Sequence, residues 1–333
     1  MNAQTARRTL TARRLLRHNA VPLLAGLIFA AMFTLYLVLQ PRGVQVGVLV
    51  TAANKGVLLA LIAIAQTFVV LTGGIDLSVG AIVVLANCLA STLLSGSPAH
   101  LAVGVLAVLA CGVAAGSVNA LAVVAGRLQP IIATLATSTI FYGIALLLRP
   151  GPGGDIDDDF ASALTGAVSV VPVTILFLIG LLVVFWLPFQ RSVTGRGIYA
   201  VGSAEASAYI SGVRIARAKA TAYVLSGIFA SLAGLLLTLI AESGQASAIQ
   251  AGDFTLNAIA AVVIGGTSLF GGAGGLVGSI IGAFILRTIG DLLFVLRASP
   301  LWQPLFQGLI LLAAVSLGAL PLLRIRNRLE TYR

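Results

Sequence analysis

The sequence predicts an all-α membrane protein that crosses the bilayer many times, for three reasons. Of its 333 residues, 59% are hydrophobic and only 9% are charged, whereas soluble domains carry about 25% charged residues. Ten apolar stretches approach the roughly 20 residues that a membrane-spanning helix needs. The 37 glycines are typical of membrane helices that pack closely through small side chains.

The expected spans follow one another with short connections. They cover residues 20–40, 54–72, 77–95, 100–125, 130–149, 171–189, 220–241, 253–268, 274–296 and 302–322. Gly-rich turns separate the second span from the third and the eighth from the ninth. The sequence therefore predicts one transmembrane domain over residues 20–322, flanked by basic tails at 1–19 and 323–333.

The distribution of charge predicts the orientation in the membrane. If the N-terminus is cytoplasmic and ten spans alternate, most of the 20 Lys and Arg residues lie on the cytoplasmic side. They are those of the two tails, Arg127 in a short turn, and the cations of the segment 191–219. The outside then receives the acidic loop 155–159 together with Glu242 and Asp253. An odd number of spans would put a basic terminus on the wrong face, so we expect both termini in the cytoplasm.

The segment 190–219 is a basic interruption between long apolar runs. It contains one acidic residue, Glu205, and the five cations Arg191, Arg196, Arg214, Arg217 and Lys219. A positively charged internal loop of a multi-span protein belongs in the cytoplasm. Small residues recur through its middle, which favours a structured docking element over a solvated linker. The sequence therefore predicts that this segment meets another component on the cytoplasmic side.

The motif GGIDLSVG at residues 73–80 separates the second span from the third. Gly73 and Gly74 can end a helix, because glycine accepts backbone angles that other residues avoid. Asp76 or Ser78 can then cap the next helix by accepting from its first free N–H groups. A second interpretation is a membrane break that lines a translocation path, because unpaired backbone at membrane depth must face protein or water. Local physical chemistry alone favours the cap.

A second Gly-rich region occupies residues 264–285. Three of its glycines recur every four residues, which predicts a helical face that packs closely against a neighbouring helix: Gly274, Gly278 and Gly282. The stripe Gly112–Gly116–Ala120 has the same meaning for the fourth span.

Two charged residues, Arg287 and Asp291, lie inside the ninth span. They are four residues apart on one helical face, and charges at that depth usually pair. An ion pair within the helix and a polar lining for a solute are equally good interpretations.

The uncharged polar residues of the spans are Asn54, Gln66, Asn87, Asn119 and Asn257. Such groups bind hydroxyl-rich solutes, but more commonly they form hydrogen bonds between helices.

Several kinds of chemistry are missing from the sequence. No P-loop pattern precedes either lysine, Lys55 or Lys219, so ATP would have to bind to another subunit. The two histidines, His18 and His100, have no metal-binding spacing. The net charge of +10 does not indicate nucleic-acid binding, because the cations lie in short tails and loops between apolar spans. We therefore expect no cofactor, metal or catalytic residue on this chain.

Four segments together resemble a known family. They are LTGGIDLSVGA (71–81), NALAVVAGRLQPIIATLAT (119–137), TGRGIYAVGSAEASAYISGV (194–213) and LNAIAAVVIGGTSLFGGAGGLVGSIIGA (256–283). In order and spacing they are similar to the membrane permease subunits of bacterial ATP-binding-cassette importers for ribose, xylose, galactose and related sugars. The sequence departs from the family at Asn257, where members usually have Asp, and at Arg287 and Asp291, where relatives are usually uncharged.

The resemblance implies a fold similar to the cobalamin-type importers, in the bacterial inner membrane. It implies a second permease copy or a homologous permease, two ATP-binding cassettes that hold ATP and Mg, and a periplasmic or lipid-anchored sugar-binding protein. It assigns coupling to the ATPase to Gly195, Arg196, Gly197, Tyr199, Gly202, Ser203, Ala204, Glu205 and Ala206. The candidates for the translocation path are Gly73, Gly74, Asp76, Ser78, Asn119, Asn257, Arg287 and Asp291.

The sequence therefore predicts a permease that moves a small hydrophilic solute, foremost a monosaccharide, inward by alternating access. An ion-gradient-driven transporter is one alternative, and it would need ionisable residues at the membrane midplane, for which Arg287 and Asp291 are the candidates. The same ATP-driven architecture for an amino acid, a nucleoside or a sugar-derived signal is another. A membrane-embedded enzyme is disfavoured, because the sequence offers no paired catalytic groups.

Overall fold

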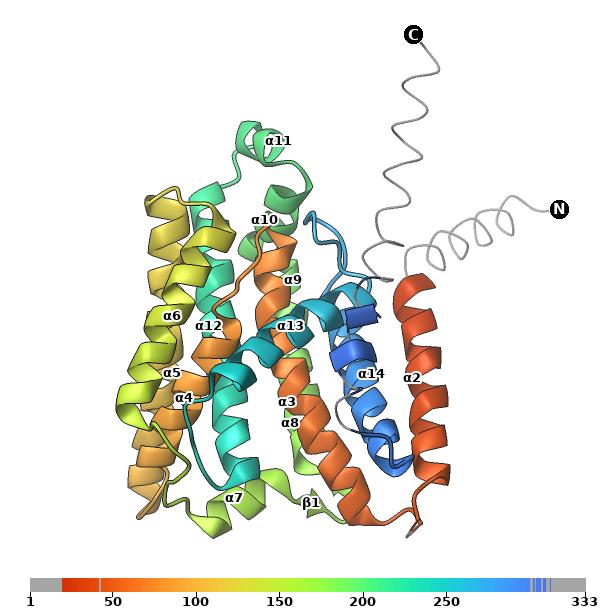
Figure 1. Ribbon diagram of the computed structural model, residues 1–333. Helices are drawn as coiled ribbons and strands as arrows, with labels where there is room; N and C mark the ends of the chain where they lie inside the picture. The colour runs from red at the N-terminus through yellow and green to blue at the C-terminus, as the bar shows by residue number, and fades with distance from the viewer. Residues whose placement is uncertain are drawn as a thin grey trace, which may run out of the picture.

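The computed structural model of the protein describes residues 20–41, 43–299, 302, 304–306, 308, 309 and 312, and within these ranges the chain is mostly helical (Figure 1). The first helices are α2 (Ala20–Val38), α3 (Val46–Leu71), α4 (Val79–Leu93), α5 (Pro98–Ala120), its π-helical continuation η1 (Leu121–Ala125) and α6 (Pro130–Leu148). A short helix α7 (Asp158–Thr165) and a hairpin of β1 (Ala167–Val168) and β2 (Val171–Pro172) follow.

The second half of the chain begins with one long helix in three parts, α8 (Val173–Leu181), η2 (Leu182–Trp186) and α9 (Leu187–Arg191). Two short helices, α10 (Val193–Ser203) and α11 (Glu205–Ile210), come next. The remaining helices are α12 (Ile215–Ala241), α13 (Ala248–Ile264) and α14 (Leu276–Val295).

The helices confirm the predicted class of an all-α, polytopic membrane protein. In the part of the chain that the structure describes, six helices are long and apolar enough to cross a bilayer, and three shorter helices are apolar as well. These helices overlap the expected spans from 20–40 to 274–296, and α3 and α13 both begin earlier than expected. The expected span 302–322 lies mostly outside the described residues, and the basic tails lie wholly outside them.

The helices α3 and α12 form the centre of the bundle (Figure 1). Of the most apolar 18-residue stretch of each helix, 72% is buried in α3 and 67% in α12, but only 28% in α6. α6 exposes large apolar side chains, among them Ile132 and Leu147. A helix with such a surface faces lipid or another protein.

The start of α3 differs from the expected span. The helix begins at Val46 rather than near residue 54, so Asn54 lies inside it. The Asn54 side chain does not interrupt the helix, because its polar atoms find partners in neighbouring elements. Its Nδ2 donates to the Thr165 carbonyl at 2.8 Å, and its Oδ1 accepts from the Thr174 hydroxyl at 2.8 Å. Asn54 is therefore used for packing between elements.

Close helix packing through glycine is confirmed at two crossings. A side chain at Gly116 of α5 would collide with the Tyr223 carbonyl of α12, and one at Gly282 of α14 would collide with the Ala261 carbonyl of α13. Both contacts bring two helix backbones together, as small residues do in membranes.

The prediction that Gly274 belongs to the same helical stripe as Gly278 and Gly282 is wrong. α14 begins only at Leu276. Gly274 precedes it in a loop with φ of +106° and packs against Thr267. Because this backbone angle is left-handed, Gly274 cannot be part of the right-handed helix α14. The helical stripe therefore starts at Gly278.

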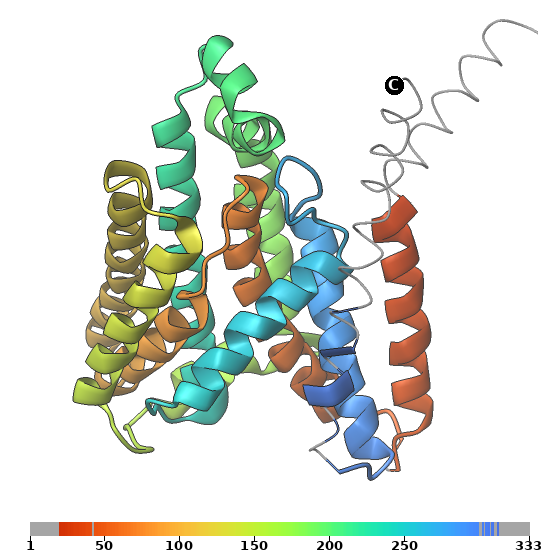
Figure 2. The same ribbon diagram turned by 45° about the horizontal axis from the view of Figure 1, so that its top comes forward.

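The two ends of the bundle are different. α10 and α11 project from one end, whereas α7 and the β-hairpin lie at the other (Figures 1 and 2). At the α7 end, Gly153 and Gly244 form an isolated antiparallel bridge between two loops. The Asp157 N–H donates to the Leu94 carbonyl there at 2.9 Å. The basic segment and the acidic loop 155–159 thus lie at opposite ends, which the predicted topology requires.

Candidate functional site

A non-helical segment, residues 72–78, interrupts the bundle between α3 and α4. α3 ends in a turn at which Gly73 has φ of +80°. The N–H groups of Gly73 and Gly74 donate to the carbonyls of Val70 and Val69 at 2.9 and 3.2 Å. The chain then turns back into the bundle and enters α4 at a lower level than the end of α3 (Figure 1). Backbone of this kind at membrane depth needs polar partners from protein or water.

Asp76 is the centre of this segment and is fully buried. Its Oδ1 accepts from the Ser78 N–H at 2.9 Å and from the Ser78 hydroxyl at 2.6 Å, and its Oδ2 accepts from the Ser226 hydroxyl of α12 at 3.1 Å. The Gln66 amide of α3, in the orientation that satisfies both groups, donates to the Asp76 carbonyl at 2.9 Å and accepts from its N–H at 3.3 Å. No Lys or Arg of the described residues forms an ion pair with Asp76, so hydrogen bonds hold this carboxyl group.

Side chains of α5 and α6 extend the network. Asn119 of α5 donates from Nδ2 to the Ser78 hydroxyl oxygen at 2.7 Å and accepts from the Thr137 hydroxyl of α6 at 2.6 Å. The Thr134 hydroxyl oxygen of α6 accepts from the Leu77 N–H at 2.9 Å. A fully satisfied buried network of this kind rigidifies the segment that it surrounds.

The expected cap of α4 is wrong in its detail. Ser78 precedes the helix, but its backbone is helical and its side chain makes no capping hydrogen bond. Its hydroxyl instead donates to Asp76 and accepts from the Asn119 side chain. The Gly80 N–H donates instead to Thr255 of α13 at 3.1 Å. The segment is therefore held by the helices around it. That it lines a translocation path stays a prediction.

The end of α10 rests directly on this break. A side chain at Gly202 would collide with the carbonyl of Leu71, the last residue of α3, and with the N–H of Gly272. The Gly272 N–H donates to the same Leu71 carbonyl at 3.1 Å. The end of α10, the end of α3 and the loop 265–275 before α14 therefore meet in one close backbone contact.

Two side chains of α10 bind the same loop. The Tyr199 hydroxyl donates to the Gly274 carbonyl at 3.1 Å, and the Ser203 hydroxyl donates to the Gly272 carbonyl at 3.4 Å. Burial raises the pKa of Tyr199, so its hydroxyl stays protonated and available as a donor at neutral pH. These bonds attach α10 to the loop that leads into α14.

The predicted coupling residues divide into two groups. Gly195 and Gly202 pack so closely against backbone of the same chain that a side chain there would collide, whereas Gly197 is buried but has room for a Cβ. Arg196, Ser203, Ala204, Glu205 and Ala206 are exposed. Tyr209 and Ile210 of α11, which the sequence analysis did not single out, are 72% and 85% exposed. The exposed surface at this end therefore includes side chains of both α10 and α11.

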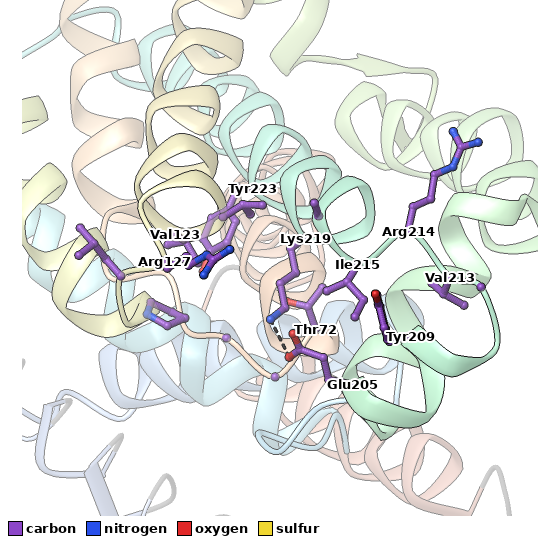
Figure 3. A pocket seen from close by; sticks show the side chains of 17 residues that line it. Thr72, Val123, Arg127, Glu205, Tyr209, Val213, Arg214, Ile215, Lys219 and Tyr223 are labelled. Atoms are coloured by element: carbon purple, nitrogen blue, oxygen red, sulfur yellow. Dashed lines mark hydrogen bonds and ion pairs between the residues drawn. The ribbon is translucent and has the colours of Figure 1, made fainter.

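A cavity of about 910 Å³ opens at the same end, between α11, the start of α12, η1 and the break (Figure 3). Thr72, Gly73 and Gly74 line it from the break, and Tyr209 and Val213 line it from the α11 side. The cavity therefore separates the exposed helix α11 from the membrane break.

The cavity is lined by an ion pair and by two further cationic side chains. Lys219 Nζ of α12 lies 2.7 Å from Glu205 Oε2 of α11. Arg127 lines the opposite side, and Arg214 points away from the ion pair (Figure 3). Tyr223 forms part of the wall, and its hydroxyl is close to Gly74. The lining combines charged, hydroxyl and apolar groups, as a site for a polar solute does.

The structure brings only some of the predicted path residues together. Gly73 and Gly74 line the cavity, whereas Asp76, Ser78 and Asn119 form the buried network beside it. The others, Asn257, Arg287 and Asp291, do not join this network. Arg287 Nη2 instead lies 2.9 Å from Asp291 Oδ1, which confirms the intrahelical ion pair.

The sequence analysis missed the hydroxyl groups of the network. Thr134, Thr137, Ser226 and Thr255 lie inside apolar helices, where Ser and Thr usually bond the preceding turn of their own helix. Thr134 and Thr255 do so as well, at 2.8 and 3.0 Å to Pro130 and Ala251. Their spacing carries no signal that separates the two uses.

The described ranges contain no cluster of three or more His, Cys, Asp or Glu side chains able to hold a metal ion.

The fold and the site define a polytopic helical membrane protein with a break in its bundle and two short, partly exposed helices, α10 and α11, at one end. Residues 48–315 match the family described as branched-chain amino acid transport system / permease component. This match covers more than half of the chain, so the chain belongs to this family of transport permeases.

Three relatives with known names are similar to this chain over most of its length. The ribose import permease RbsC of Bacillus subtilis is 38% identical over 261 residues, which cover 77% of this chain and 80% of the relative. The D-allose permease AlsC of Escherichia coli K12 is 35% identical over 262 residues, 78% of this chain and 79% of the relative. The autoinducer 2 permease LsrC of Enterobacter sp. is 33% identical over 314 residues, 93% of this chain and 88% of the relative. No solved structure matches the chain. The predicted resemblance to sugar-importer permeases is confirmed.

Proposed function

We propose that this chain is the transmembrane subunit of an ATP-driven importer in a bacterial inner membrane, and that it moves a monosaccharide inward by alternating access. The ribose and allose permeases among its relatives support this solute class. The relative named for autoinducer 2 keeps a sugar-derived signal as the second candidate solute. ATP and Mg bind to a separate partner, because the sequence has no P-loop pattern.

The observation that carries this proposal is the contact between α10 and the two Gly-rich breaks. Gly202 lies on the Leu71 carbonyl, and Tyr199 and Ser203 bind the loop before α14. A partner that moved α11 would pull on α10 and therefore on both breaks at once. Because the cavity lies between α11 and the first break, the same motion would change its opening.

The proposed assembly contains a second permease, two ATP-binding cassettes and a periplasmic or lipid-anchored sugar-binding protein. The apolar outer surface of α6 offers a contact for lipid or for the second permease. The acidic loop 155–159 faces the binding protein in this proposal. The proposed topology has ten spans with both termini in the cytoplasm, and it is supported by the basic segment and the acidic loop at opposite ends of the bundle.

The ion-gradient alternative has less support. Its candidates for ion coupling, Arg287 and Asp291, are bound to each other at 2.9 Å. They line a cavity near the α7 end of the molecule, away from the break at 72–78.

The partner is tested by a pull-down of the tagged chain from its native membranes in mild detergent, followed by mass spectrometry. We expect a P-loop ATPase and a solute-binding protein among the recovered partners. A stable preparation that transports without any ATPase would contradict the proposal and support the ion-gradient alternative.

The topology is tested by cysteine labelling in intact cells. Cys88 is buried and Cys111 is half-buried, and both are first replaced by alanine. Asp158 and Ser203 are both exposed, so single cysteines there differ mainly in the side of the membrane. We expect an impermeant thiol reagent to label Asp158→Cys and not Ser203→Cys until the cells are opened. The reversed pattern would overturn the topology.

A further inference from the structure

A second cavity lies between α2, α3 and α14, at the α7 end of the molecule. Its volume is about 480 Å³, which is in the range of sites for small ligands. Tyr36 and Gln40 line it from α2 and the turn that follows, Lys55 from α3, and Arg287 and Asp291 from α14. Nothing in the proposed transport mechanism uses this cavity.

The cavity holds more positive than negative charge. Arg287 pairs with Asp291, but its Nε is buried and has no hydrogen-bond partner among the residues that the structure describes. Lys55 is half-buried and electrostatically close to both Arg287 and Asp291. Among the described residues it forms no ion pair of its own. Two cations therefore line this cavity with a single carboxylate, which binds Arg287, at a depth where charges normally find partners. An anionic ligand would supply the missing partner.

An apolar groove adjoins the charged cavity. It has a volume of about 360 Å³ and shares Arg287 and Asp291 with the cavity. Its other walls are formed by aromatic and aliphatic side chains of α2, α8 and α14, including Phe29, Phe33, Ile175 and Phe284. A hydrocarbon chain that left the charged cavity would enter this groove directly.

We infer that the cavity and groove bind an anionic phospholipid, with its phosphate beside Lys55 and Arg287 and one acyl chain along Phe33 and Phe284. Arg287 lies eight residues before the end of α14 at Val295, about 12 Å from that end. The Arg287 side chain extends one turn toward that end, where it meets Asp291, as long basic side chains do when they keep the charged group near the headgroup region. Guanidinium and ammonium groups bind phosphate through charge-assisted hydrogen bonds. In the proposed topology this lipid belongs to the outer leaflet.

The lipid accounts for both parts of the site. A free phosphate ester would pair with the cations but leave the apolar groove empty. A zwitterionic lipid would fill the groove, but its headgroup carries a positive charge of its own, so the positive charge of the cavity would stay uncompensated. Only an anionic lipid matches the charge of the cavity and the apolar wall of the groove.

The test measures the melting temperature of the purified full-length chain in detergent while lipid is added. We expect phosphatidylglycerol to raise it, and phosphatidylcholine and glycerol 3-phosphate to have little effect. Lys55→Gln leaves the Arg287–Asp291 pair in place and should weaken the phosphatidylglycerol response at least about tenfold in apparent affinity. Arg297→Gln removes the same charge from an exposed position outside the cavity lining and should respond as the wild type does.

A second variant tests the groove. Ile175→Trp fills it without changing any charge, so it should also weaken the response to phosphatidylglycerol. The inference is overturned if phosphatidylcholine or glycerol 3-phosphate stabilises the wild type as well as phosphatidylglycerol does. It is also overturned if Lys55→Gln and Ile175→Trp both respond like the wild type.

Discussion

Replacing Ile210 with glutamate is expected to abolish ATP-driven uptake, because the ATPase no longer binds α11. Ile210 and its neighbour Tyr209 are 85% and 72% exposed at the end of the molecule. Exposed large apolar side chains grouped on one helix are typical of a protein interface, and a few such anchors carry most of the binding energy. An unpaired charge buried there costs about 3 kcal/mol, which is roughly a hundredfold in affinity.

The matched control for this variant is Ile249→Glu. Ile249 is 80% exposed in the first turn of α13, which follows the loop at the α7 end (Figure 1). Both variants put the same charge on an exposed isoleucine, so they differ mainly in position. The amount of ATPase that co-purifies with each variant is measured beside solute uptake. Equal recovery of the ATPase with Ile210→Glu and with wild type would show that α11 is not the docking surface.

Replacing Asp76 with leucine is expected to destabilise the protein and to stop transport. The variant leaves the Ser78 N–H and the hydroxyls of Ser78 and Ser226 without their buried acceptor. An unsatisfied buried donor costs about 1–3 kcal/mol, so we expect the free energy of unfolding to fall by about 3 kcal/mol or more. Because these bonds hold the break at 72–78, uptake should be lost even in the fraction that folds.

The companion variant Asp76→Asn separates hydrogen bonding from charge. Its Oδ1 can accept from Ser78, and its Nδ2 can donate to the Ser226 hydroxyl oxygen. We therefore expect it to fold like the wild type and to keep most of its uptake. Thermal unfolding in detergent and uptake in cells are measured for both variants. A leucine variant as stable as the wild type would show that the network does not hold the break.

The helices were predictable from the sequence because long apolar runs leave few alternatives in a bilayer. Their ends were less so, since polar residues such as Asn54 lie inside a helix wherever a neighbouring element supplies partners. Gly274 has the spacing of a helical stripe with Gly278, but a left-handed backbone angle places it in the preceding loop. Spacing alone does not report that angle.

Of the candidate site, only the residues of the motif at 73–80 were predictable from the sequence, and their partners on other helices were not. GGIDLSVG identified Gly73, Asp76 and Ser78, because glycine can end one helix and Asp or Ser can cap the next. The partners of Asp76 come from helices far apart in sequence, such as Ser226, which is 150 residues away. The role of Gly202 in coupling to the ATPase stays a prediction, but its contact with Leu71 of the same chain was not predicted. Such contacts depend on tertiary packing, which no local pattern records.

The most direct test of the central claim is transport by the reconstituted protein. The chain is incorporated into liposomes together with the ATPase that co-purifies with it, and the solute-binding protein is added outside. The uptake of labelled ribose and allose into the liposomes is then measured. The account predicts uptake that requires ATP and that is lost with Ile210→Glu but kept with Ile249→Glu. Uptake driven by an ion gradient in the absence of both ATP and the ATPase would contradict it.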